Sequence, residues 1–138
     1  MRKAQTENAL DCAVIVNNWI SKTKEMPKLF NKIELEQMIK EAIPFREVWL
    51  VCNPAKGYIS LNRQTLQIMG LYTLEPGNGL GKILLDKVKL NRSYLHLWSH
   101  SFNKKAHKFY QREGFCVIGE KEKGDDGLPE IHFEWKRN

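Results

Sequence analysis

The chain has 138 residues, of which 42% are hydrophobic and 28% are charged. This length and balance are typical of one globular domain and exclude a disordered chain. No apolar run approaches the roughly 20 residues of a membrane helix, and residues 1–3 lead into polar sequence rather than into the apolar stretch of a signal peptide. We therefore expect a cytoplasmic protein with no membrane segment.

The net charge of +6 raises the question of a nucleic-acid partner. The basic residues are scattered over one loop and two predicted helices, and none forms a compact run interleaved with stacking aromatic residues. A nucleic-acid-binding function therefore ranks below the alternatives developed here.

The three cysteines, Cys12, Cys52 and Cys116, are odd in number and widely spaced, and each falls in an apolar segment. This pattern predicts buried free thiols in a reducing compartment. It argues against a disulfide, a cysteine metal site and a catalytic cysteine.

In chain order, the first third predicts a short strand and two helices. The strand covers 1–5, and the helices run over about 6–20 and 33–43. The first helix carries apolar residues on several sides, including Leu10 and Val14, so we expect it to be well buried.

Three strands are predicted next, at 47–53, 57–62 and 65–73. The links between them are short enough for hairpins, so neighbouring strands should be antiparallel. Gly70 lies inside the third of these strands, where a glycine favours a bulge or the close approach of another backbone.

The most informative segment is the glycine-rich turn that follows. Gly77, Gly79 and Gly81 stand between the end of a strand and an amphipathic helix at about 80–89. Glycines leave backbone N–H groups bare, and the first N–H groups of a helix lack internal partners. The turn therefore predicts a phosphate or pyrophosphate site. An isolated turn of this kind can equally be a tight helix start without a ligand, and the nucleotide triphosphatase and dinucleotide fingerprints are absent.

A second motif follows a predicted strand at 95–99. A helix is predicted at 104–113, with Asn103 as N-cap and Gly114 as the residue just past its end. The pattern is Asn-x-x-Ala-x-x-Phe-Tyr-x-x-x-Gly-Phe, formed by Asn103, Ala106, Phe109, Tyr110, Gly114 and Phe115.

Two closing strands are predicted at 115–121 and 130–136. In the last strand Ile131, Phe133 and Trp135 alternate with polar residues, so these three side chains should face the core. The whole chain, 1–138, is thus predicted to be a single domain of the α/β (α+β) class. Its mixed, mostly antiparallel sheet has about seven strands, with four helices on both faces.

The two motifs, in this order and about twenty residues apart, resemble motifs A and B of the GNAT superfamily of acyl-CoA N-acyltransferases. The resemblance covers nearly the whole chain. It implies an N-acetyltransferase that uses acetyl-CoA, with the coenzyme A pyrophosphate held at the glycine-rich turn. One departure is Pro76, where the family usually has Gln or Arg, so a side-chain contact is lost while the backbone amides remain.

The resemblance implies cofactor contacts from three segments: a strand edge, the turn and the following helix motif. These are Leu71, Tyr72 and Thr73; Gly77, Asn78, Gly79, Leu80, Gly81 and Lys82; and Asn103, Ala106, Phe109 and Tyr110.

Tyr110 matches the family's general acid, which protonates the departing thiolate, although a packed tyrosine is the structural alternative. The general base is not identified, because the strand at 65–73 carries no acid. His100 is the best titratable candidate near the site, since an imidazole transfers protons near neutral pH. Glu25 and Glu47 are further candidates that could relay a proton through water.

The four histidines show no ligand spacing with cysteine or carboxylate residues, so no metal site is predicted. The leading hypothesis is transfer of an acetyl group to a primary amine by direct attack in a ternary complex. The alternative is a coenzyme A-binding module with little or no catalysis. The sequence does not identify the amine acceptor, and the exposed edges of the closing strands make a homodimer a further prediction.

Overall fold

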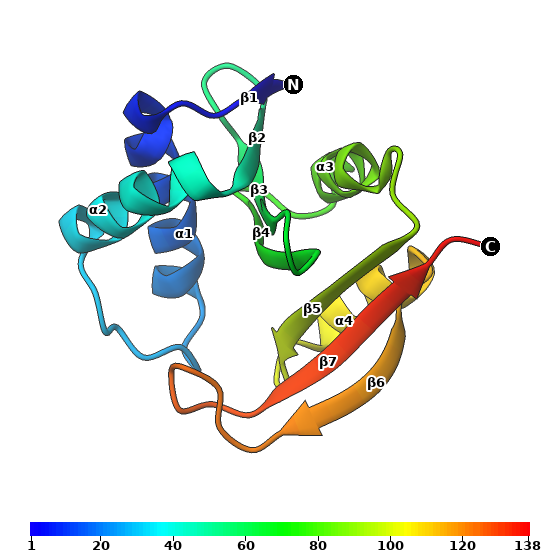
Figure 1. Ribbon diagram of the computed structural model, residues 1–138. Helices are drawn as coiled ribbons and strands as arrows, with labels where there is room; N and C mark the ends of the chain where they lie inside the picture. The colour runs from blue at the N-terminus through cyan, green and yellow to red at the C-terminus, as the bar shows by residue number, and fades with distance from the viewer.

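A seven-stranded sheet runs through the computed structural model, which describes all 138 residues (Figure 1). The strand order is β1-β2-β3-β4-β5-β7-β6, and every neighbouring pair is antiparallel except β4 and β5. This confirms the predicted mixed, mostly antiparallel sheet. The strands are β1 Arg2–Lys3, β2 Glu47–Val51, β3 Gly57–Asn62, β4 Gln67–Thr73, β5 Tyr94–His100, β6 Cys116–Lys121 and β7 Glu130–Lys136.

Four α-helices and two short 3-10 turns complete the fold. The second helix begins with a capping box, in which Asn31 accepts a hydrogen bond from the Glu34 amide at 2.8 Å and the Glu34 carboxylate accepts one from the Asn31 amide. None of the helices combines the length and apolar character needed to cross a bilayer. The helices are α1 Ala9–Lys22, α2 Lys32–Ala42, α3 Leu80–Lys89 and α4 Lys104–Arg112, and the 3-10 turns are Thr6–Asn8 and Ile43–Phe45.

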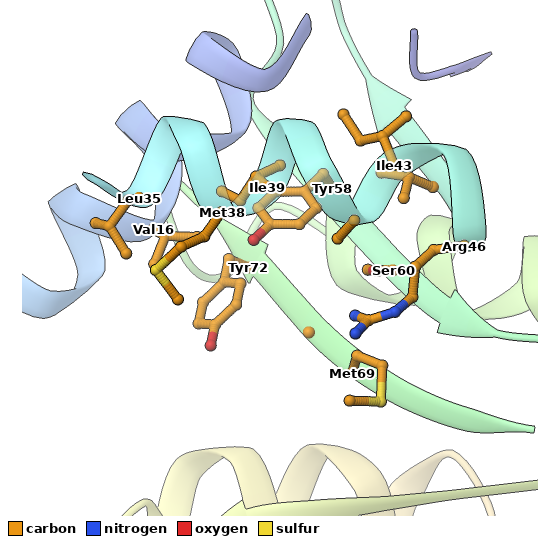
Figure 2. Close-up of a pocket in the computed structure, with 13 residues that line it drawn as sticks. Val16, Leu35, Met38, Ile39, Ile43, Arg46, Tyr58, Ser60, Met69 and Tyr72 are labelled. Carbon is orange, nitrogen blue, oxygen red and sulfur yellow. The ribbon is translucent and has the colours of Figure 1, made fainter. Parts of the chain in front are cut away.

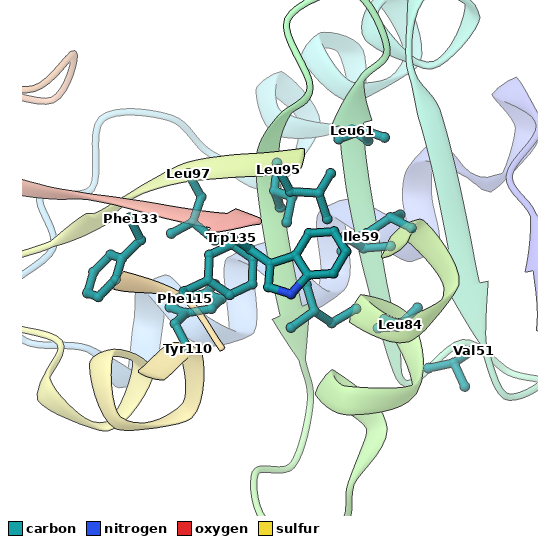
Figure 3. Close-up of a cluster of buried hydrophobic side chains, with 13 residues drawn as sticks. Val51, Ile59, Leu61, Leu84, Leu95, Leu97, Tyr110, Phe115, Phe133 and Trp135 are labelled. Carbon is teal, nitrogen blue, oxygen red and sulfur yellow. The ribbon is translucent and has the colours of Figure 1, made fainter. Parts of the chain in front are cut away.

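Each face of the sheet has its own hydrophobic core. Residues of α1 and α2 pack on one face, and residues of α3 and α4 pack on the other (Figure 3). In the α3–α4 core Phe133 and Trp135 are buried and Ile131 is partly buried, so the predicted inward face of the last strand is confirmed.

The two parallel strands separate soon after they meet. β4 and β5 pair only where Gln67 faces His96 and Ile68 faces Leu97. A bulge in β4 follows at once: the register with β3 shifts so that Met69 has no partner, next to Gly70. The bulge predicted at Gly70 is therefore confirmed. Beyond it, the end of β4 pairs with β3 only, and its other edge is free.

Two predictions about burial are wrong. Leu10 and Val14 are 44% and 41% exposed, because α1 packs on α2 and the sheet along one side and leaves its outer side to solvent. Only Cys12 is a buried thiol, and burial, reinforced by the charge of Asp11, raises its pKa to about 12.

Cys52 and Cys116 are exposed, against the expectation from their apolar neighbours. Cys52 lies in the turn between β2 and β3 and adopts a left-handed φ of 71°. Cys116 lies on β6, an outer strand of the sheet that has a neighbour on one side only. All three cysteines are free.

Candidate functional site

The glycine-rich turn joins the free end of β4 to α3. Gly77 and Gly79 have φ values of 85° and 80°, and a Cβ added at either would meet nothing within 4 Å. Gly79 is the N-cap of α3, and the amide of Leu80 makes only a long 3.4 Å contact with Asn78 Oδ1. The first amides of α3 are therefore accessible, and the space in front of them can admit an anion.

Gly81 and Lys82 lie where α3 packs against α4 and the adjacent Glu113. Gly81 lacks the positive φ of the other two glycines, and a Cβ there would lie 3.3 Å from the ring of Phe109 on α4. Lys82 Nζ lies 3.0 Å from a carboxylate oxygen of Glu113 and 3.2 Å from one of Asp86. Its ammonium group is therefore already paired, and these hydrogen bonds raise its pKa.

The second motif fixes the start and the packing of α4. Asn103 caps the helix, because its Oδ1 accepts a hydrogen bond from the Ala106 amide at 3.3 Å, as predicted. Ala106 and Phe109 pack against the α3–α4 core. The motif thus places two buried side chains, those of Tyr110 and Phe115, inside this core.

Tyr110 is held by the aromatic rings of Phe115, just before β6, and Phe133 on β7. Its ring centroid lies 5.6 Å from that of Phe115 and 5.8 Å from that of Phe133. Burial raises the pKa of the Tyr110 hydroxyl well above its ordinary value, and the nearby Tyr72 of β4 adds to the effect. The phenol therefore keeps its proton at neutral and mildly alkaline pH, as a proton donor requires.

His100 lies at the end of β5, on the side of α1. Its Nε2 lies 2.6 Å from Asp126 Oδ2 and 3.9 Å from a carboxylate oxygen of Glu130. Its ring stacks between Trp19 of α1, at a centroid distance of 6.0 Å, and Phe102, at 5.2 Å. The imidazole is thus fixed by two rings and one short hydrogen bond.

The electrostatics of this pair favour an ionised carboxylate. Burial by itself would raise the pKa of Asp126, but hydrogen bonds from the His100 ring and from the Leu128 amide outweigh it and the pKa is lowered. Asp126 lies in the loop between β6 and β7, far from His100 in the sequence. Sequence reasoning found His100 and missed its partner.

The fold also brings a third potential metal ligand, Glu130, next to His100 and Asp126. His100, Asp126 and Glu130 each offer one atom, and these atoms lie within 4.8 Å of one another. The sequence spacing could not show this cluster, because the three residues come together only when β7 pairs with β5. The prediction that the chain binds no metal stays a prediction.

The other two candidate proton relays, Glu47 and Glu25, are not part of the cluster at His100. Glu47 accepts hydrogen bonds from Arg92 at 2.8 Å and from the indole N–H of Trp49 at 3.0 Å. Arg92 lies just after α3 and donates a hydrogen bond to the Val88 carbonyl of that helix, so the Glu47 carboxylate is bound on the α3 side of the sheet. A role for Glu47 as a proton relay stays a prediction. Glu25 is exposed in the loop between α1 and α2.

A cavity of about 240 Å³ lies between α2 and the sheet, on the face opposite the glycine-rich turn (Figure 2). Ten of its 13 lining residues are hydrophobic, and Arg46 supplies its one formal charge. Gly70 and Tyr72 form part of the wall, so the cavity extends to the free end of β4. Its residues come from six elements and from Arg46, and no sequence pattern predicts the cavity.

No protein-family model matches the chain. A curated Escherichia coli protein, peptidyl-lysine N-acetyltransferase YjaB, is 23% identical over 132 residues, which cover 94% of this chain and 90% of YjaB. The solution structure of YjaB in its apo form superposes with a TM-score of 0.72 at 21% identity, over 99% of this chain and 97% of YjaB.

Two further solved structures have the same fold. A GNAT-family acetyltransferase from Bacillus cereus matches with a TM-score of 0.77 at 19% identity, over 99% of this chain and 96% of that one. The chain has the GNAT fold. YncA from Salmonella typhimurium, whose structure includes its cofactor acetyl-CoA, matches this GNAT-fold protein with a TM-score of 0.73 at 15% identity, over 99% and 92% of the two chains.

The family resemblance drawn from the two sequence motifs is thus confirmed at the level of the fold. In this GNAT-fold protein the glycine-rich turn and the free edge of β4 meet at one point of the sheet, and Tyr110 approaches from α4. The roles of the individual site residues stay predictions.

Proposed function

We propose that this GNAT-fold protein is an N-acetyltransferase that uses acetyl-CoA and a primary amine as its two substrates. The observation that carries the proposal is the free edge of β4, where the strand has left β5. An open glycine-rich turn lies at the end of this edge, and His100 and an apolar cavity lie on the other face. Two substrates can therefore reach the same edge from opposite faces of the sheet.

The turn and the strand edge bind acetyl-CoA in this proposal. The accessible amides at the start of α3, after Gly77 and Gly79, receive the pyrophosphate. The free edge over Leu71–Thr73 supplies backbone groups to the pantetheine arm. The amide of Leu71 or Tyr72 donates a hydrogen bond to the acetyl carbonyl and stabilises the negative charge that develops on its oxygen.

Tyr110 provides the proton for the leaving group. As the amine nitrogen bonds to the acetyl carbon and the carbon–sulfur bond breaks, the sulfur takes the phenolic proton. The burial of Tyr110 supports this role, because a raised pKa keeps the hydroxyl protonated until the thiolate forms.

His100 receives the proton that the amine must lose. An alkyl ammonium group has a pKa near 10.4, so a base is needed at neutral pH. Asp126 accepts the hydrogen bond from His100 Nε2, which fixes the ring and leaves Nδ1 as the acceptor for the substrate proton. The carboxylate also stabilises the imidazolium that results, as a carboxylate does in other histidine–acid pairs.

The relatives support the same reaction class. YjaB is named a peptidyl-lysine N-acetyltransferase, and the YncA structure includes acetyl-CoA. Three free cysteines fit a reducing compartment, so we place the protein in the cytoplasm. A homodimer through the outer strand β6, where Val117 and Ile118 are 52% and 46% exposed, stays a prediction.

The test combines cofactor binding with turnover. Coenzyme A should raise the melting temperature with increasing concentration, and acetyl-CoA should release free thiol when a panel of primary amines, including lysine peptides, is added. A coenzyme A-dependent shift without turnover on any amine up to pH 9 would favour the binding module. A shift with nucleic acid and none with coenzyme A would overturn the acetyltransferase proposal.

A further inference from the structure

We propose that the acceptor is an amine that an apolar group joins to a carboxylate, as in an ω-amino acid. The cavity under α2 would hold the apolar group and Arg46 would bind the carboxylate. This inference names the substrate class of the acetyltransferase site and rests on the proposed function for the fate of the amine.

The walls of the cavity call for an apolar occupant. Val16, Leu35, Ile39 and Ile43 project from the helical side, and Met69 lies on the strand side (Figure 2). When an apolar group enters this space, water is removed from its own surface and from the cavity wall, which is favourable. The volume of about 240 Å³ sets a limit of one short apolar chain or one ring rather than a long peptide segment.

Arg46 gives this apolar space a single charge. Its guanidinium points into the cavity from the end of the 3-10 turn after α2, with Ser60 beside it (Figure 2). It forms no ion pair with any carboxylate of the chain. No Asp or Glu lines the cavity either. A guanidinium beside apolar walls is matched best by a carboxylate, which it can bind through two parallel hydrogen bonds.

The opposite charge lies past the far wall of the cavity. Tyr72 forms part of that wall, and its ring contacts Trp19, which stacks on His100. Asp126 and Glu130 are near enough to Tyr72 for their charges to act on its hydroxyl. The site is therefore positive at Arg46, apolar in the middle and negative beside the candidate base.

This order of charges selects among amines. A simple alkyl amine would fill the apolar space and leave Arg46 unpaired, while a polyamine would bring a second cation towards it. An amine with an acidic group satisfies both ends, and its ammonium group faces the two carboxylates next to His100. The apolar group then lies between them, along the cavity.

The first experiment needs no acetyl transfer. Calorimetric titration would compare 3-phenylpropanoate with the neutral 3-phenylpropanamide at fixed ionic strength, on the wild type, Arg46→Gln and Arg63→Gln. Arg63 is exposed in the loop after β3 and serves as the matched control. We expect the wild type and Arg63→Gln to bind the anion roughly 10- to 100-fold tighter than the amide, and Arg46→Gln to lose this preference.

The second experiment measures kcat/KM for 6-aminohexanoate, its amide and hexylamine with acetyl-CoA. The wild type should favour the free amino acid through a lower KM, and Arg46→Gln should remove that advantage. Equal binding of anion and amide, or an anion preference that survives in Arg46→Gln, would overturn the inference even if other amines are acetylated. An anion preference that depends on Arg46 without turnover on any amine would support the ligand class and reject the proposed acetyltransferase.

Discussion

The two faces of the sheet differ in how their functional residues are spread along the chain. On the face of α3 and α4, the proposed cofactor residues fall in two short segments, 71–82 and 103–110. On the face of α1 and α2, the candidate acceptor residues are single positions far apart in sequence, such as Trp19, Arg46 and Asp126. A ligand held by backbone amides and helix starts leaves a local sequence signal, whereas a ligand held by converging side chains does not.

The largest effect is expected when a glycine of the glycine-rich turn is replaced. Gly79→Val should abolish measurable coenzyme A binding, because the side chain would fill the space in front of the α3 amides and φ is 80° there. Gly127→Val is the matched control: its φ is 84°, it also has nothing within 4 Å, and it lies in the loop between β6 and β7. The readout is the coenzyme A-dependent rise in melting temperature.

Both variants should lose similar stability, and only Gly79→Val should lose the response to coenzyme A. If folded Gly79→Val binds coenzyme A as the wild type does, the pyrophosphate lies elsewhere. If both variants lose the response equally, strain rather than blocked access explains the loss.

The next largest effect is expected when the proposed general acid, Tyr110, loses its hydroxyl. Tyr110→Phe removes one hydroxyl and keeps the ring that packs on Phe115 and Phe133. kcat should fall by roughly 10²- to 10⁴-fold while the affinity for coenzyme A changes little. Tyr94→Phe on β5, which removes a hydroxyl that donates a hydrogen bond to Glu134 of β7, is the control and should keep its kcat.

The pH profile sharpens this test. Because burial raises the pKa of Tyr110 well above 10, ionisation of this phenol should cause no fall in the wild-type rate below pH 10. A wild-type kcat in the Tyr110→Phe variant would leave water as the proton donor and make Tyr110 a packing residue.

A smaller effect is expected on the acceptor face, where one side chain positions another. Asp126→Asn should lower kcat/KM about 10- to 100-fold, the usual range for loss of a residue that orients a functional histidine. Asp126→Glu should restore part of the rate, because it keeps a carboxylate beside the His100 ring. The adjacent Asp125 is exposed, so Asp125→Asn is the matched control. An equal loss of rate in Asp126→Asn and Asp125→Asn, or no loss in Asp126→Asn, would argue against Asp126 as the residue that positions His100.

The sequence predicted best what local rules determine. The alternation in β7, the Asn103 cap, the bulge at Gly70 and the anion-accessible turn all depend on residues within a few positions of one another. Each follows from a backbone preference that holds in any fold. The order of two such segments was then sufficient to predict the fold.

The rest depends on tertiary structure that no local pattern encodes. Cys52 and Cys116 have apolar neighbours, but a turn and an outer strand expose them. The hydrogen bond from His100 to Asp126 exists because the β6–β7 loop returns to the end of β5. The cavity at Arg46 is formed where helices and strands do not fill the space between them. Its shape depends on how these elements pack, which no local sequence pattern predicts.

The smallest effect is expected at Glu47, where a substitution should change the free energy of unfolding and leave kcat/KM nearly unchanged. Glu47 joins β2 to the end of α3 through its ion pair with Arg92 at 2.8 Å. Burial would raise the pKa of Glu47, but its hydrogen bonds with Arg92 and Trp49 outweigh it, and the pKa is lowered. A carboxyl group with a lowered pKa in the folded state stabilises the fold above its unfolded pKa of about 4.3, and this contribution disappears as the pH falls through the folded value.

Glu47→Gln should therefore lower the free energy of unfolding by about 1 kcal/mol at pH 7, and the difference from the wild type should shrink towards zero below pH 4. Its kcat/KM should stay within about twofold of the wild type, because Arg92 and Trp49 hold the Glu47 carboxylate on the α3 side of the sheet. Glu25→Gln, at an exposed position without an ion pair, should change neither quantity. Urea unfolding at pH 7 and pH 3.5 measures the first effect. A large fall in kcat/KM for Glu47→Gln with unchanged stability would place catalysis on the α3 side and remove the division between the two faces.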